Sequence, residues 1–129
     1  TYAVAGYPNI HVIGDACAVP ASDNKGVPKS GHMANSEAKV CADAIVRALA
    51  GEAPDSNVTT NSACYSPITS KTASWLSASF NYGDIYDAAG NVKGKGMHRV
   101  DLGEADRADG DGYEDMFTWA GSLFADSFA

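Results

Sequence analysis

The sequence predicts an α+β fold: a strand, a loop and a long helix, followed by a small antiparallel sheet and a closing helix. Two observations carry this prediction. A long stretch with helical periodicity lies in the first half of the chain, and after residue 62 aromatic or aliphatic residues alternate with small polar ones, as in strands. A polar connection over 51–62 separates the two patterns. We therefore expect a first unit over 1–54 and a second over 55–129.

The first unit begins with a short strand and a loop. Residues 10–13, Ile-His-Val-Ile, are apolar and β-branched, and Gly14 ends them, so they predict a buried strand. Residues 16–28 contain two prolines, a glycine and several turn formers, which predicts a loop.

A long helix follows this loop. Pro28 and Ser30 are start signals, and Gly51 is a stop signal. Charged residues, Glu37 among them, are expected on the outer faces of the helix. The apolar face is rich in small residues, which permits close packing against another element, and consists of Ala34, Ala38, Cys41, Ile45 and Leu49.

The second unit is expected to hold at least two antiparallel strands and a helix. Strand spacing is seen at Trp75, Phe80, Tyr82 and Ile85, and residues 87–91, Asp-Ala-Ala-Gly-Asn, predict a turn. The closing stretch over 116–128 predicts an amphipathic helix with one apolar face, formed by Phe117, Ala120, Phe124 and Phe128.

Residues 103–115 are acidic and rich in glycine, which predicts a loop. A calcium-binding EF-hand loop needs an acid at its first position and a glutamate at its twelfth. With Gly112 at the sixth position, Arg107 and Thr118 occupy those two places. We therefore interpret this stretch as a solvated acidic loop and predict no metal site.

The composition indicates a folded, acidic chain. Of its 129 residues 45% are hydrophobic, and the net charge is −7. Nucleic acids and anionic membranes bind basic surfaces, so we expect neither as a partner. No apolar run approaches the roughly 20 residues that cross a bilayer, so no membrane span is expected. Because the first residue is not methionine, we expect a chain cut from a longer polypeptide.

Two short stretches are candidates for binding a cofactor. Gly14 permits close approach of a ligand to the backbone, and Asp15 is able to accept hydrogen bonds from ribitol hydroxyls; an ordinary capped turn is the alternative. Lys29, Ser30 and Gly31 stand at a helix N-terminus, which favours negative charge such as that of a reduced flavin. A capped helix with a solvated lysine is the alternative there.

The cysteines and the second tryptophan leave further alternatives open. Cys64 follows a polar loop and fits either a redox thiol or a buried small side chain. Cys41 is expected in the core, and the role of Cys17 stays open. Trp119 is most simply a core residue, together with Phe117 and Phe124. The three histidines form no pattern typical of a hydrolase or a metal site.

Four motifs taken in order resemble one family of flavoproteins. They are Gly14-Asp15, the Pro-Lys-Ser-Gly at 28–31, the Cys-Tyr-Ser at 64–66 and the tryptophan-containing helix at the end. In this order they resemble the C-terminal flavin-binding portion of flavocytochrome c sulfide dehydrogenase, within the sulfide:quinone reductase-like group of flavoprotein disulfide reductases. The resemblance covers nearly the whole chain and is weakest over 70–112.

The resemblance implies a cofactor and a reaction. Residues 1–54 would end an FAD-binding α/β domain, and 55–129 would form an interface domain against the flavin. Asp15 would bind the ribitol of FAD. Gly14 would allow the close approach, and Lys29, Ser30 and Gly31 would face the flavin ring. Cys64 would be half of a redox-active disulfide that sulfide attacks, with Trp119 near the flavin.

The resemblance also implies partners and a location. Electrons would pass to the haem c of a cytochrome c subunit in the bacterial periplasm. The dinucleotide fingerprint and the second cysteine of the pair lie upstream in this family, in a flavoprotein region that this sequence lacks. The chain alone is therefore expected to be inactive, to hold FAD poorly and to form a homodimer through its uncovered surfaces. The alternatives are a related flavin reductase with a quinone or nicotinamide acceptor, and a non-catalytic secreted interaction domain.

Overall fold

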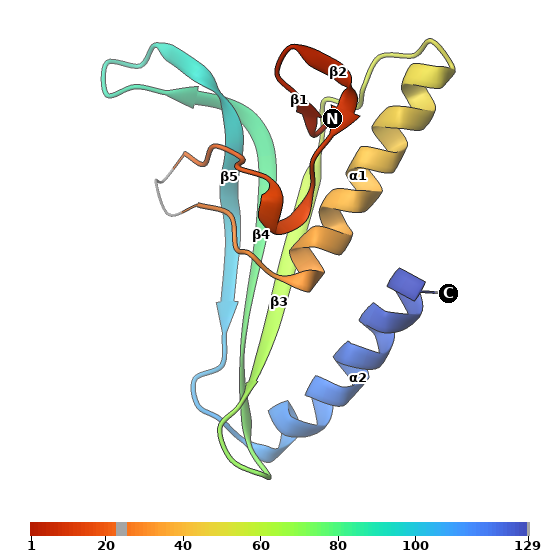
Figure 1. Ribbon diagram of the computed structural model, residues 1–129. Helices are drawn as coiled ribbons and strands as arrows, with labels where there is room; N and C mark the ends of the chain where they lie inside the picture. The colour runs from red at the N-terminus through yellow and green to blue at the C-terminus, as the bar shows by residue number, and fades with distance from the viewer. Residues whose placement is uncertain (23–25, 129) are drawn as a thin grey trace.

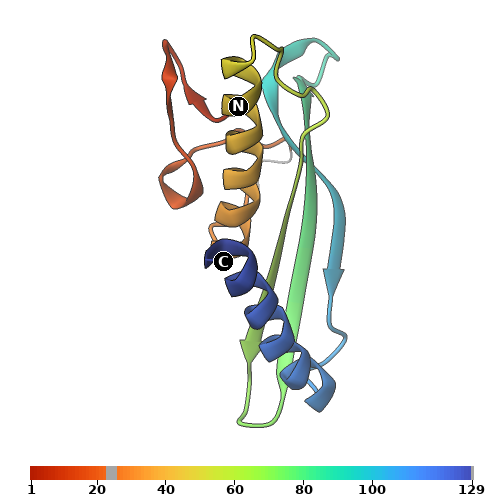
Figure 2. The same cartoon turned by 90° about the vertical axis from the view of Figure 1, so that its right-hand side faces the viewer.

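The fold is α+β, as predicted. The computed structural model describes residues 1–22 and 26–128, and within them the chain forms two long helices and two antiparallel sheets (Figure 1). The larger sheet has three strands, and both helices lie on the same side of it, with α1 beside its upper part and α2 beside its lower part (Figure 2). None of the helices in the described residues is long and apolar enough to cross a membrane.

The predicted buried strand is present with different bounds and is not buried. Strand β2 covers Tyr7–His11 and pairs with the two-residue strand β1, Ala3–Val4. Ile10 is 53% exposed, because this small sheet has no second layer of structure over it. A short 3-10 helix, η1, follows at Gly14–Ala16.

Helix α1, Gly31–Leu49, confirms the prediction for this region. The hydroxyl of Ser30 accepts a hydrogen bond from the backbone N–H of Met33 at 3.2 Å and caps the first turn. Gly51 has φ +74°, the left-handed conformation in which glycine commonly ends a helix.

The buried side of α1 differs from the predicted one. Its buried residues are Met33, Glu37, Cys41 and Ala44. Cys41 is in the core as predicted, but Leu49 is 85% exposed and the carboxylate-bearing Glu37 is buried. The cause is tertiary: the large sheet and η1 cover the side of the helix that carries Met33 and Glu37.

The large sheet contains three antiparallel strands in sequential order, where at least two were predicted. Its strands are β3 at Thr59–Pro67, β4 at Ala73–Tyr86 and β5 at Val92–Glu104. The predicted turn over 87–91 connects the last two. The core lies between α1 and this sheet and consists of Met33, Ala78, Phe80 and Met97. The expected boundary near 54 falls between α1 and β3, and residues from both sides of it build this core.

Helix α1 closes part of the free edge of β3. The backbone N–H of Asn61 donates to the Ser36 hydroxyl at 3.1 Å, and that of Ala63 donates to Nδ1 of His32 at 3.0 Å. His32 and Ser36 are one helical turn apart, so one face of α1 satisfies successive outward-pointing N–H groups of the strand.

The opposite edge, on β5, is covered by part of the loop predicted over 16–28. Residues 19–22, which we call the strap, form a parallel bridge to Met97. The Met97 N–H donates to the Pro20 carbonyl at 2.8 Å, and the Ser22 N–H donates to the Met97 carbonyl at 3.0 Å. A side chain at Gly96 would place Cβ 2.4 Å from the Pro20 oxygen. The strap therefore requires glycine at this position.

Helix α2, Gly110–Phe128, corrects the prediction of a loop over 103–115. Strand β5 continues to Glu104, and the helix begins six residues before the predicted start at 116. The Asp109 carboxylate accepts from the Gly112 N–H at 2.8 Å, and its backbone bridges Ala73. The acidic, glycine-rich sequence is thus a helix start held against β4.

The side chains of α2 also correct an expectation. Phe117 and Phe124 were expected in the core, but they are 59% and 61% exposed. Trp119 is half-buried and lies on a different side of the helix. The predicted apolar face of this helix exists, but it faces away from the sheet.

Candidate functional site

The residues singled out in the sequence lie in four segments that meet around the N-terminal end of α1. These segments are η1, the first turn of α1, the middle of β3 and the middle of α2. We call this region the α1 site. Hydrogen bonds and ring contacts connect each of its segments to α1.

Lys29 connects η1 to the start of α1. Its ammonium group donates to the carbonyl oxygen of Asp15 at 3.2 Å and also to that of Cys17. The Asp15 side chain itself is exposed. The two halves of the predicted cofactor clamp, Gly14-Asp15 and Lys29-Ser30, are therefore adjacent in space.

Glu37 is a residue of the site that the sequence analysis placed on the wrong face. It is 3% exposed, and its carboxylate accepts from the Gly14 N–H at 2.5 Å. Gly14 has φ +67°, and an added Cβ would lie 3.3 Å from Cβ of Ala34. The turn at Gly14 is therefore fixed on α1. Only tertiary packing brings the Gly14 N–H to Glu37. Helical periodicity in the sequence does not contain this contact and therefore predicted Glu37 on the polar side.

The N-terminus of α1 is open to solvent at Gly31. Gly31 is exposed, and an added Cβ would meet no atom within 4 Å. The Ser30 hydroxyl is already engaged, since it caps Met33 and shares a hydrogen bond with the Ser62 hydroxyl at 2.9 Å. This contact places β3 beside the positive end of the helix dipole.

The three cysteines are free thiols in different environments. Cys64 is exposed on β3, two residues after Ser62, so the alternative of a buried small side chain is wrong for it. Cys41 is buried. Cys17 is half-buried, and burial together with the nearby Glu37 carboxylate raises its pKa, with Lys29 opposing the rise.

Trp119 brings α2 to the site. Its ring lies 5.4 Å from that of Tyr65 and 6.2 Å from that of His32, between centroids. Its indole N–H donates to Nδ1 of His32 at 3.3 Å. Because that nitrogen also accepts from Ala63, it is the unprotonated one in the neutral ring. His32, which had no assigned role, thus links three elements.

The donors of this site fit the electron-rich edge of a flavin ring. An open helix N-terminus at Gly31 and the cationic Lys29 favour negative charge, and the exposed Asp15 is an acceptor for hydroxyl groups. Within residues 1–22 and 26–128, no three His, Cys, Asp or Glu side chains are grouped to hold a metal ion.

A large groove borders the site on the side of Cys17. Its volume is about 910 Å³, and it runs between the N-terminal segment, the strap and the β4–β5 pair. Its lining includes Tyr2, Cys17, Val58 and Met97. The Tyr2 hydroxyl is buried without a hydrogen-bond partner, and this burial raises its pKa. Most of the lining residues are apolar, and Asp55, Asp84 and Lys95 also border the groove.

No model of a known protein family matches the sequence.

Proposed function

We propose that this chain is the C-terminal flavin-binding portion of a sulfide-oxidising flavoprotein, similar to flavocytochrome c sulfide dehydrogenase. One observation carries the proposal: four motifs far apart in the sequence, at Gly14-Asp15, Lys29-Ser30, Cys64 and Trp119, lie around one helix N-terminus. A chance set of motifs would have no reason to meet at one place in the fold.

The chain's own residues would hold the flavin at its ring end. Lys29 and the N-terminus of α1 would face the pyrimidine edge of the ring, where negative charge develops on reduction, and Asp15 would bind the ribitol. Bound FAD would supply the two-electron acceptor for the reaction. The pyrophosphate cradle would come from the upstream flavoprotein region, so this chain alone would be inactive.

Cys64 would be the chain's residue in the chemistry. In the assembled enzyme it would form a disulfide with a cysteine of the upstream region. Hydrosulfide would attack this disulfide, forming a persulfide on one sulfur and releasing the other as a thiolate. The two electrons so gained would leave through the flavin. The exposure of Cys64 on β3 supports access by a small inorganic sulfur substrate.

The acceptor in this proposal is the haem c of a cytochrome c subunit, and the setting is the bacterial periplasm. Trp119 would lie between the flavin and this partner. Support comes from its packing on Tyr65, the residue after Cys64, so an aromatic pair lies close to this cysteine along β3.

Riboflavin binding tests the proposal, because riboflavin carries the ring and the ribitol without the pyrophosphate. We expect weak binding, measured by quenching of flavin fluorescence. Asp15→Asn and Lys29→Ala should each weaken it about tenfold, as expected for the loss of one charge-assisted hydrogen bond. The matched control is Lys93→Ala, an exposed lysine on β5 away from the site.

Two results would contradict the proposal. One is no riboflavin binding at any soluble concentration. The other is equal binding by the wild type, Asp15→Asn and Lys29→Ala. Purification of the chain with stoichiometric yellow flavin would contradict the narrower claim that the pyrophosphate cradle is elsewhere.

A further inference from the structure

Helix α2 carries an aromatic stripe that faces solvent. Phe117, Phe124 and Phe128 are 59%, 61% and 83% exposed. Tyr113 stacks edge-on with Phe117 at 5.3 Å, and Phe124 lies 6.3 Å from Phe128, between ring centroids. These residues recur at steps of four, seven and four residues and lie on one side of the helix. We call this set of four residues the α2 stripe.

Within residues 1–22 and 26–128, the rest of the chain does not cover the stripe, because other sides of α2 contact it. Its N-terminus is held by Gly112, whose added Cβ would lie 2.7 Å from the Ala73 carbonyl oxygen. Its middle is held by Trp119, which faces His32 and Tyr65, and its end by Asp126, which pairs with Lys39. Both views show α2 leaning away from the sheet (Figures 1 and 2).

The charge around the stripe is one-sided. Between Gly110 and Phe128 the sequence has four acidic residues, Asp111, Glu114, Asp115 and Asp126, and no lysine or arginine. The preceding segment adds three more acids, Glu104, Asp106 and Asp109, against one arginine, Arg107. Seven of the chain's 16 acidic residues therefore lie between Glu104 and Phe128, against one arginine.

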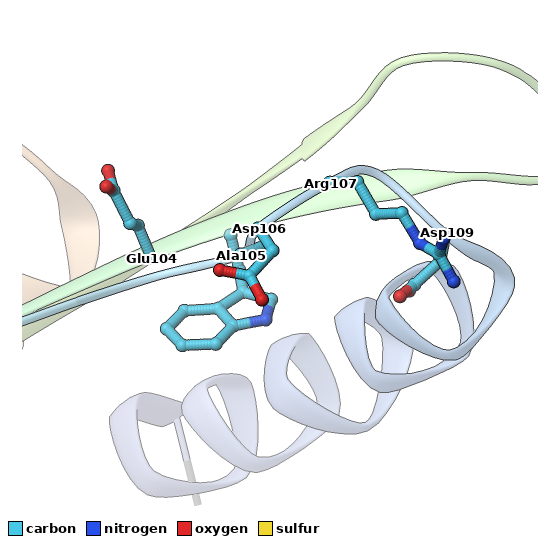
Figure 3. Close-up of a pocket in the computed structure, with 6 residues that line it drawn as sticks. Glu104, Ala105, Asp106, Arg107 and Asp109 are labelled. Carbon is cyan, nitrogen blue, oxygen red and sulfur yellow. The ribbon is translucent and has the colours of Figure 1, made fainter.

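A hollow beside the start of α2 is bordered by three of these acids, Glu104, Asp106 and Asp109, and by Arg107. It has a volume of about 450 Å³ and is lined by Trp75 together with residues 104–107 and 109 (Figure 3). The Asp106 carboxylate points into the space above the helix in this view. An aromatic face next to carboxylates is a favourable site for a lysine or arginine side chain, through cation–π and charge attraction.

The same charges decide which partner fits the stripe. A second copy packed through α2 would bring two sets of acids together, which is repulsive, and an anionic membrane would be repelled as well. We propose that the α2 stripe and its acidic surroundings form a docking surface for a basic amphipathic helix of a partner protein. Apolar side chains of that helix pack on the phenylalanines, and its lysines or arginines meet the carboxylates.

This surface does not depend on the proposed flavin chemistry. Trp119 contacts the α1 site from another side of α2, and among the described residues no hydrogen bond or ring contact joins the stripe to Lys29, Ser30 or Cys64. Failure of riboflavin binding would therefore not contradict the docking surface, and failure of peptide binding to the stripe would not contradict the proposed flavin site.

A designed peptide tests the docking surface. The probe is a fluorescein-labelled helical peptide of about 18 residues, long enough for a stable helix on a partner, made of leucine and lysine at amphipathic spacing. We expect it to bind the full chain in fluorescence anisotropy and to bind more weakly at high salt, because screening weakens the charge attraction. The control probe has glutamate in place of lysine and should not bind.

Matched variants locate the binding. Phe117→Ala combined with Phe124→Ala should weaken binding about tenfold or more, as truncation of two interface anchors does. Asp111→Asn combined with Glu114→Gln should reduce both the affinity and its salt dependence. Leu49→Ala, an apolar truncation on α1 at a side chain that is 85% exposed, should change nothing. Circular dichroism checks that each variant keeps its helices. If the phenylalanine variant unfolds, the variant with Asp111→Asn and Glu114→Gln still tests the surface, because it leaves the phenylalanines in place.

Four outcomes would overturn the proposal. They are no binding of the lysine peptide, equal binding of the glutamate peptide, unchanged binding by both α2 variants, and loss of binding in Leu49→Ala. A dimer in sedimentation equilibrium that dissociates on Phe117→Ala with Phe124→Ala would assign the stripe to a second copy and also overturn it.

Discussion

The two long helices of this chain have equal length and opposite relations to the rest of the molecule. Helix α1 buries four residues against the sheet and η1, and its first turn supplies a cap, a bridge to β3 and a contact to the Asp15 turn. Helix α2 buries only Gly112 and leaves three phenylalanines in solvent.

This difference shows that amphipathic pattern and burial are separate properties. Both helices have an apolar face in the sequence, yet α1 buries a different side that shares Cys41 with that face, and α2 leaves its face exposed. For α1 the buried side is the one that the sheet and η1 cover, and for α2 the apolar side stays exposed to solvent.

The largest test of the contrast compares equivalent truncations in the two helices. Met33→Ala removes a side chain that is 2% exposed at the centre of the core. It should lower the free energy of unfolding by about 2–5 kcal/mol, as buried methionine truncations do. Phe117→Ala, at 59% exposure, should change it by less than about 1 kcal/mol. Urea denaturation followed by circular dichroism measures both, and similar losses would contradict the contrast.

The attachment of α2 is tested next. Trp119→Leu removes the indole N–H bond to His32 and the contact with Tyr65. We expect the free energy of unfolding to fall by about 1–3 kcal/mol, because the substitution removes both a half-buried aromatic ring and a hydrogen bond. Hydrogen exchange should rise in α2 while α1 stays protected. Faster exchange throughout both helices would show that α2 is integral to the core after all.

Thiol labelling compares buried and exposed positions through the reaction rates of the three cysteines. Cys64 is exposed and Cys41 is buried, so Cys64 should react with iodoacetamide at least about tenfold faster at neutral pH. Cys17 should react more slowly than Cys64, because burial and Glu37 raise its pKa and leave little thiolate. Peptide mass spectrometry resolves the three rates. A Cys41 that reacts as fast as Cys64 would contradict the buried face of α1.

The smallest effect concerns the ion pair that Lys39 of α1 forms with Asp126 of α2. Asp126 lies 2.5 Å from the Lys39 ammonium group, which lowers its pKa below the ordinary value of 3.8. A lowered folded-state pKa stabilises the contact above the unfolded pKa, and this stabilisation is lost as the pH falls through the folded value. Exchange at the end of α2 should therefore rise below about pH 3.8. Lys39→Gln, measured alongside, should show that rise already at neutral pH.

Much of the local structure could be predicted from sequence. The start and end of α1 were correct because Ser30 and Gly51 act through local backbone chemistry, and the turn at 87–91 was correct for the same reason. The loop predicted over 103–115 was wrong because Asp109 and the glycines beside it are also typical of turns. Only pairing with Ala73 shows that they begin a helix.

The candidate site was predictable in part. Motif order singled out Lys29, Cys64 and Trp119, which lie in segments around one helix end, and their roles stay a prediction. Glu37 and His32 were missed, because their partners, the Gly14 N–H and the Trp119 indole, are brought to them only by tertiary packing. In the sequence, a glutamate that is buried in a helix cannot be told from one on the surface, because the turn that bonds its carboxylate reaches it only in the folded chain.

The strap has a consequence for the order in which this chain folds. Strands β4 and β5 pair through a short turn, whereas Ala21 and Met97 bridge across most of the sequence. The entropy cost of closing a loop grows with its length, so the hairpin should form early and the strap late. Until the strap arrives, the β5 edge at Met97 is unpaired. Newly made chains would then be most prone to associate strand to strand during this interval, before the native state has sealed that edge.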